Sequence, residues 1–302
     1  MRHLKELFAL LRETCTQWLG HKAPRLAAAL AYYMVFSLAP MLIIAIAIAG
    51  AIFGEDAARG QIVVQISGVV GEEAARIIER AIANASQPDL SNFASIVSVG
   101  VLFFAASGVF AQLQDALNTI WGVQPKPGRE VIQFITKRII SFAIVISIGF
   151  LVILSLLFST GMAGLIQLEL IPGLSELWQY VSTVISFVLT TILFALIFKF
   201  LPDAKVAWSD VWIGAMITSV LFGVGRWLLE WYFAQTGFGS TYGAAGSLIV
   251  LLAWVYYSAQ ILFLGAEFTE VYARKYGSRI TPNRHSMKVT TTPIEYPEED
   301  EQ

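Results

Sequence analysis

The sequence predicts an all-α polytopic membrane protein with six transmembrane helices. Of its 302 residues, 56% are hydrophobic and only 14% are charged, a balance far from that of a soluble domain. Stretches without Asp, Glu, Lys or Arg cover more than half of the chain. A bilayer core about 30 Å thick requires roughly 20 helical residues, and several of these stretches reach that length. They are residues 26–54, 90–114, 139–168, 177–198 and 231–266.

Residues 1–25 are predicted to form a cytoplasmic amphipathic helix that precedes the membrane domain. Apolar residues recur at intervals of three or four over residues 4–19 and form one stripe. Two interpretations are open: the stripe lies on the membrane surface, or it packs on the transmembrane bundle. Because Glu6, Arg12 and Glu13 interrupt the apolar residues, we expect no cleaved signal peptide here.

The membrane domain is predicted over residues 26–276, and its first span covers 26–53. Pro40 removes a backbone donor, so we expect a kink between Ser37 and Pro40 that faces protein or water instead of lipid. Residues 54–89 follow as an extracytoplasmic loop. Their apolar and charged residues separate onto opposite sides of a helix, which predicts a helical loop.

The next three spans follow from the charge-free stretches. The second span begins near Ser91, and its helical pattern continues to Trp121. The third span covers about 139–166 and the fourth about 177–198. Because the connection between them is short, we expect these two helices to be antiparallel neighbours.

The fifth span, residues 210–235, contains Arg226 and Glu230. These two residues are four apart and share a helix face, where pairing lowers the cost of their charges. A glycine-rich entry, residues 237–247, leads into the sixth span. Residues 277–302 are polar with an acidic end, and we expect this cytoplasmic tail to be disordered.

The distribution of basic residues predicts the orientation in the membrane. In the six-span arrangement, 16 of the 20 Lys and Arg residues lie on the side of the two termini. Short loops rich in Lys and Arg stay in the cytoplasm, so both termini are expected there. An even number of spans independently requires the termini to share a side.

Composition and motifs argue against several classes of protein. A net charge of −2 provides no basic excess for binding nucleic acid. Cys15 and the histidines His3, His21 and His285 are dispersed in the sequence, which argues against a metal centre. The sequence contains no recognisable catalytic or nucleotide-binding motif. We therefore expect neither a cofactor nor enzymatic activity. The expected partners are membrane lipids, and a homo-oligomer is compatible with the sequence.

Polar residues gather at the end of the second span. Gln112, Gln114, Asp115 and Asn118 occupy adjoining faces of the predicted helix. One interpretation is the lining of a polar cavity, because ionisable residues inside membranes mark transport pathways. The other is a helix end at the level of the lipid headgroups, where polar residues cost little. We expect Asp115, the one charge in the cluster, to be a working residue.

Other polar residues in the spans have both a functional and a structural interpretation. For Arg226 and Glu230 the functional interpretation is that they line a pathway, and the structural one is that they join two helices. Glu267 lies near the cytoplasmic end of the sixth span, where we expect a salt bridge at the helix end. Tyr32 is an intramembrane hydrogen-bond donor or an interface anchor. For Gly243 the functional interpretation is a broken helix that opens toward a cavity, and the structural one is a close contact between helices.

Three segments resemble the YihY/BrkB family of bacterial inner-membrane proteins, whose members once carried the label ribonuclease BN. They are AAALAYYMVFSLAP at 27–40, GVFAQLQDALNTIWGV at 108–123, and the stretch from STYGAAG to EFTEVYA at 240–273. The resemblance covers about residues 20–277 and implies six spans in the inner membrane, without a settled activity. It also implies a set of site residues: Tyr32, Ser37, Pro40, Gln114, Asp115, Asn118, Tyr242, Gly243, Trp254 and Glu267.

Two functions from different classes follow. The first is a transporter, or a protein that handles lipids or envelope components, with a cavity lined by spans one, two, five and six. The second is a non-catalytic scaffold for envelope assembly, in which the polar groups only join helices. A ribonuclease would need a catalytic constellation and a basic surface, and the sequence contains neither.

Overall fold

The computed structural model describes residues 2–37, 104, 107–127, 174–236 and 243–289. Most of this part of the chain is helical. The helices are α1 (Arg2–Gly20), α6 (Gly108–Ile120), α8 (Leu174–Phe200), α9 (Trp208–Thr236) and α11 (Gly243–Lys275), and residues 23–37 are helical as well.

Three of the described helices contain stretches that are long and apolar enough to cross a membrane: Tyr180–Phe200, Trp208–Leu229 and Leu251–Lys275. They coincide with the predicted fourth, fifth and sixth spans. The predicted first span begins within helix 23–37, and the predicted second span ends within α6. The remainder of these two spans, the third span, the kink at Pro40 and the loop 54–89 lie outside the described residues.

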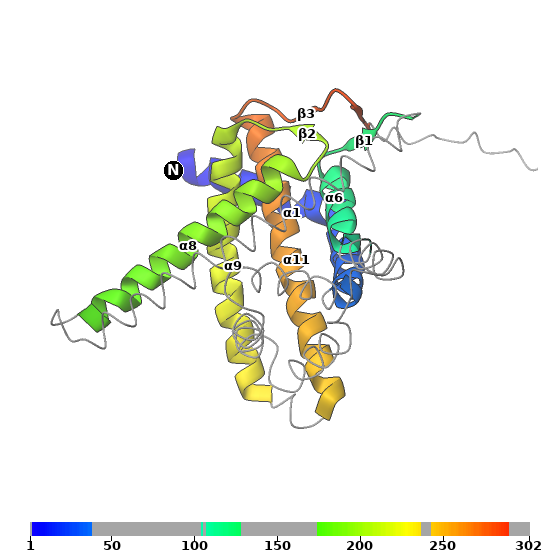
Figure 1. Ribbon diagram of the computed structural model, residues 1–302. Coiled ribbons are helices and arrows are strands. Elements are labelled where there is room, and N and C mark those ends of the chain that lie inside the picture. Colours follow the sequence, from blue (N-terminus) through cyan, green and yellow to red (C-terminus); the bar gives the residue numbers. More distant parts are fainter. Residues whose placement is uncertain (1, 38–103, 105–106, 128–173, 237–242, 290–302) are drawn as a thin grey trace, which may run out of the picture.

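Helices α9 and α11 lie side by side (Figure 1) and pack through two glycine–threonine contacts. A β-carbon added at Gly214 would overlap Thr269, and one added at Gly265 would overlap Thr218. Each threonine hydroxyl donates to the glycine carbonyl four residues earlier in its own helix, at 2.7 Å in both cases. The contacts run in opposite directions along the two helices, so the helices are antiparallel, and small residues allow their backbones to approach closely.

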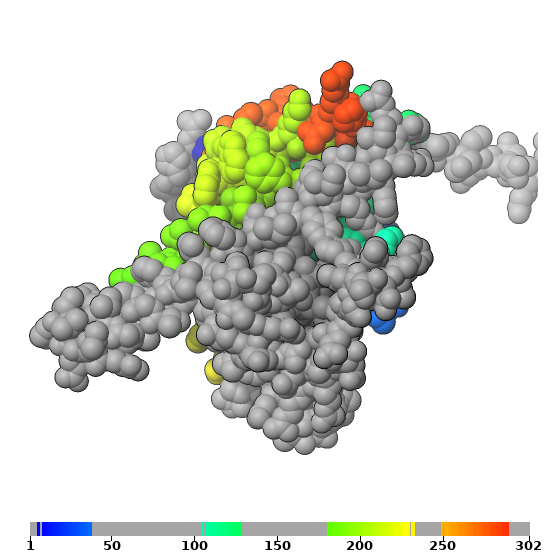
Figure 2. Space-filling model, viewed as in Figure 1, coloured from blue at the N-terminus to red at the C-terminus, as the bar shows by residue number. Residues whose placement is uncertain are grey.

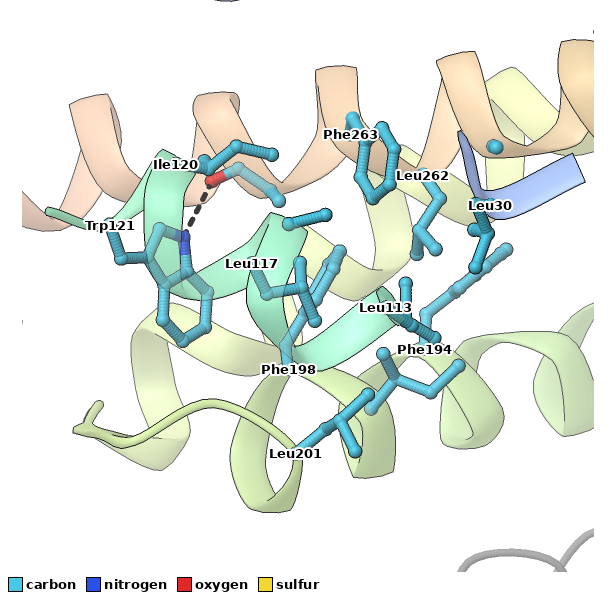
Figure 3. Close-up of a cluster of buried hydrophobic side chains, with 14 of the residues drawn as sticks. Leu30, Leu113, Leu117, Ile120, Trp121, Phe194, Phe198, Leu201, Leu262 and Phe263 are labelled. Carbon is cyan, nitrogen blue, oxygen red and sulfur yellow. Dashed lines mark hydrogen bonds between the residues drawn. The ribbon is translucent and has the colours of Figure 1, made fainter. Parts of the chain in front are cut away.

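The largest apolar core joins α6 to α8 and α11. Leu117, Phe198 and Phe263 come from these three helices and are fully buried. Figure 3 shows them packed together, with the indole of Trp121 at the edge of the cluster. Trp121 Nε1 donates to the Ala266 carbonyl at 3.1 Å, which ties the end of α6 to α11 one residue before Glu267.

Besides the predicted helices, the described residues form four short strands, which the sequence did not predict. Strand β1 (Val123–Pro125) pairs with β4 (Ser286–Lys288), and β2 (Ala204–Lys205) pairs with β3 (Thr281–Pro282). Both pairs are antiparallel. Strands of two or three residues carry no readable alternation of apolar and polar residues, so periodicity did not predict them.

The prediction of a disordered C-terminal tail also needs correction, because residues 277–289 are ordered. Figure 2 shows this segment, coloured orange to red, spread over one end of the molecule. Ser278 N donates to Asp210 Oδ2 at 3.0 Å, and Val289 N donates to the Gly122 carbonyl at 2.8 Å. Backbone hydrogen bonds attach the segment. They do not depend on apolar side chains, so the low hydrophobicity of the segment did not indicate its order. The expectation of disorder for 290–302 concerns residues outside those the structure describes.

Helix α1 packs on the bundle with one face and exposes apolar residues elsewhere. Leu10 is buried against Phe268 and Val271 of α11. Phe8 and Leu19 are exposed, at 71% and 64% of their surface. One face therefore packs on the bundle, and another remains available to a membrane surface.

Candidate functional site

Two buried amides of α6 converge on the carboxylate of Asp203, in the turn between α8 and β2. Gln114 Nε2 donates to Asp203 Oδ1 at 3.3 Å, and Asn118 Nδ2 donates to Oδ2 at 2.9 Å. Asn118 Oδ1 accepts the Asp203 backbone N–H at 2.8 Å. The Asp203 carbonyl in turn accepts the N–H of Asn283 at 3.0 Å. This Asp203 cluster therefore holds α6, the end of α8 and the tail together.

The other two residues of the predicted cluster occupy different positions. Asp115 is exposed, and Gln112 is half-buried. The acidic residue that Gln114 and Asn118 bind is thus Asp203 and not Asp115. A working role for Asp115 stays a prediction.

A second polar site joins the end of α1 to α11. His21 Nδ1 lies 2.7 Å from Glu267 Oε1. α1 ends at Gly20, and Lys22 has a φ of 55°, a left-handed conformation that is costly for lysine. The strained turn redirects the chain from α1 into helix 23–37, and His21 contacts α11 at this turn.

Glu267 is fully buried, and only one of its oxygens is satisfied. Its exposed fraction is 0%, and Oε2 has no hydrogen-bond partner among the described residues. An unpaired buried polar atom costs about 1–3 kcal/mol, and more when the group is charged. Asp203 differs, because both of its carboxylate oxygens accept hydrogen bonds.

Further ion pairs attach α1 to α11 beside this site. Arg274 donates to Glu13 at 2.6 Å and to Glu270 at 3.2 Å, and Lys275 also pairs with Glu13. Hydrogen bonds from Lys275 and Arg274 lower the pKa of Glu13 from its ordinary value. The hydrogen bond to Glu267 raises the pKa of His21, although burial opposes this effect.

The remaining predicted residues are dispersed over the described helices. Tyr32 is exposed, whereas Ser37 is buried where helix 23–37 approaches Gly108 of α6. Trp254 is half-buried in α11, and Arg226 is exposed on α9. The structure does not bring these residues into one cluster with Glu267.

Four predicted residues have no described surroundings. Pro40 and Tyr242 lie outside the described residues, and Glu230 and Gly243 are placed only as members of α9 and α11. Within the described ranges, no group of three or more His, Cys, Asp or Glu residues is placed to hold a metal ion.

Comparison with known proteins identifies the family. The model of the family described as Virulence factor BrkB matches residues 14–290. The chain belongs to this family. The matched range includes His21, Asp203 and Glu267, and the family assignment agrees with the resemblance noted in the sequence.

Several relatives of this BrkB-family chain are named "UPF0761 membrane protein". The relative from Mannheimia succiniciproducens is 25% identical over 90% of this chain and 91% of its own length. One from Glaesserella parasuis is 27% identical over 61% of this chain, and the match spans 63% of that relative. One from Teredinibacter turnerae is 29% identical over 92% of this chain and 62% of its own length. No solved structure matches.

Sequence reasoning missed two residues of the BrkB-family chain that form the polar contacts. His21 was considered only as a metal ligand, because the histidines and Cys15 are dispersed in the sequence, and its partner Glu267 lies 246 residues away. Asp203 was overlooked in the short loop between the predicted fourth and fifth spans, which in the six-span arrangement lies on the side of the termini, as does the end of the second span. That shared assignment was the available signal that Asp203 and Asn118 could meet.

Proposed function

We propose that this membrane protein is a transporter that moves a lipid or another envelope component, with Glu267 as a polar group of its pathway. The observation that supports the proposal is a fully buried carboxylate in a candidate membrane span, one oxygen of which has no hydrogen-bond partner in the described part of the chain. Ionisable residues in such spans are costly and occur mainly on substrate or ion pathways.

A scaffold, the alternative function, accounts for the Asp203 cluster but not for Glu267. The Asp203 cluster joins helices and satisfies both carboxylate oxygens. Attachment of α1 to α11 does not rest on Glu267 alone, because Glu13 also binds Arg274 and Lys275. A carboxylate used only for attachment would be expected to have its buried oxygens paired.

The proposed location is a bacterial inner membrane with both termini in the cytoplasm. The distribution of Lys and Arg supports this orientation. Reporter fusions after Lys126 and after Gln302 are expected to report the cytoplasm, and a fusion at Glu73 the opposite side. A cytoplasmic reporter at Glu73 would contradict the orientation.

The transport proposal is tested with the full-length protein in vesicles of phosphatidylethanolamine and phosphatidylglycerol. The probe is a short-chain fluorescent phosphatidylethanolamine, and its transfer between leaflets is measured by extraction with albumin. Empty vesicles provide the background. We expect wild type to transfer the probe and Glu267→Gln, which keeps the side-chain shape but removes the charge, to lose most of this activity.

Glu13→Gln is the matched control, since it removes a carboxylate that attaches α1 to α11 and leaves Glu267 in place. It is expected to retain transfer at equal abundance. Wild-type vesicles that behave like empty ones would contradict the proposed function. Equal loss in both variants would assign Glu267 to attachment, as a scaffold requires.

A further inference from the structure

We propose that His21 and Glu267 form a proton-binding site that couples transport to a proton gradient. The inference rests on the proposed function and names the ion that this site would use. It follows from the geometry of the pair, the difference in exposure between its members and the unpaired oxygen of Glu267.

The pair connects an aqueous surface to the interior of the bundle. The His21 side chain is 37% exposed, whereas Glu267 is completely buried. Glu267 engages His21 Nδ1 at 2.7 Å, so Nε2 is the ring nitrogen left for contact with water. A proton can therefore enter at Nε2 without any opening of the helices.

The transfer balances in two steps. A hydronium ion transfers a proton to the lone pair of His21 Nε2 and leaves as water, and the ring becomes an imidazolium that still donates from Nδ1 to Glu267. The Nδ1 proton then moves to Glu267 Oε1, which leaves a neutral imidazole protonated at Nε2 and a neutral carboxylic acid. Rotation of the carboxyl group presents this proton on the side of Oε2, the oxygen without a partner among the described residues.

The neighbouring charged residues pair with one another, and His21 is the basic group in hydrogen-bond contact with Glu267. On α1, Glu13 pairs with Arg274 and Lys275 of α11, and Arg274 also pairs with Glu270. The charge of Glu270 adds to the effect of Glu267 in favouring protonated His21.

In the described ranges, the other helices packed on α11 place no charged group in hydrogen-bond contact with the pair. On α9, Asp210 accepts hydrogen bonds from Ser278 and Ser209, and Arg226 is exposed. On α6, Asp115 is exposed. Proton uptake would thus change the charge of the His21–Glu267 pair and not that of a larger network.

The first test repeats the fluorescent-lipid assay with and without a pH difference across the vesicle membrane. We expect the gradient to accelerate transfer by wild type severalfold and a protonophore to abolish the acceleration. Glu13→Gln is expected to respond like wild type. Transfer by wild type that ignores the gradient would overturn the coupling and leave the proposed function standing, whereas absence of transfer under every condition would overturn both.

The second test observes the proton site without a transported substrate. In the His3→Gln/His285→Gln background, nitrogen-15 NMR reports the single remaining imidazole, that of His21. We expect its titration midpoint to move to lower pH in Glu267→Gln and to stay in place in Glu13→Gln. An unchanged midpoint in folded Glu267→Gln would show that the two groups do not share a proton and would overturn the inference.

Discussion

The contact between α9 and α11 predicts a large cost for one methyl group. A β-carbon at Gly214 would lie within 3.0 Å of Thr269 Cβ and overlap its hydroxyl. Thr269 is fully buried and donates to the Gly265 carbonyl. Gly214→Ala must therefore displace α11 or rotate Thr269 away from its acceptor.

The magnitude follows from three terms. Overpacking of a close contact costs about 1–3 kcal/mol, and loss of the threonine hydrogen bond adds about 1 kcal/mol. The higher helix propensity of alanine returns about 1 kcal/mol. We expect Gly214→Ala to lower the free energy of unfolding by about 1–3 kcal/mol, because the propensity term roughly offsets the hydrogen-bond term.

Gly223 provides the control on the same helix. A β-carbon there meets no atom of the described residues within 4 Å, so we expect Gly223→Ala to keep the propensity gain without a steric cost. The assay is reversible unfolding in mixed micelles of a mild detergent and dodecyl sulfate. Equal stability of Gly214→Ala and Gly223→Ala would refute the close packing of α9 on α11.

Four further outcomes are expected. Truncation after Gly277 removes both strand pairs and the contact with Asp210 and should lower the melting temperature in detergent, whereas truncation after Val289 should not. Asp115→Asn is expected to lower lipid-probe transfer at unchanged melting temperature. Asn118→Ala should instead lower the melting temperature, because it leaves buried hydrogen-bonding groups unpaired at a cost of about 1–3 kcal/mol. The folded pKa of His21 is raised above its ordinary value of 6.5. Its contribution to stability is therefore fully present below pH 6.5 and is lost as the pH rises through the folded pKa. The melting temperature of wild type should accordingly fall with rising pH in that window, and His21→Gln should weaken this dependence.

The helices of the second half of the chain could be predicted closely because long apolar runs determine them. The predicted fourth span, 177–198, lies within α8 (Leu174–Phe200), and the predicted fifth, 210–235, lies within α9 (Trp208–Thr236). A segment of this length and hydrophobicity must satisfy its backbone hydrogen bonds internally in a bilayer. The runs therefore indicate both the secondary structure and its approximate ends.

Contacts between distant segments could not be predicted from the same patterns. The tail 277–289 is ordered by backbone pairing with strands that exist only because the tail pairs with them. The His21–Glu267 contact depends on how α1 turns at Lys22 and lies along α11, which periodicity does not determine. The apolar pattern placed Gln114 and Asn118 together on the helix that became α6, but their acidic partner, Asp203, comes from another segment.

Access of water to position 267 tests most directly whether the site works or only joins helices. In a Cys15→Ser background, Glu267→Cys and Ala215→Cys each place one thiol at a side chain that is 0% exposed. A small membrane-impermeant maleimide is added to vesicles, and the rate of labelling is measured. A transporter that opens at Glu267 predicts steady labelling at position 267 and none at 215. Position 267 as unreactive as 215 would contradict the proposal and favour a static scaffold.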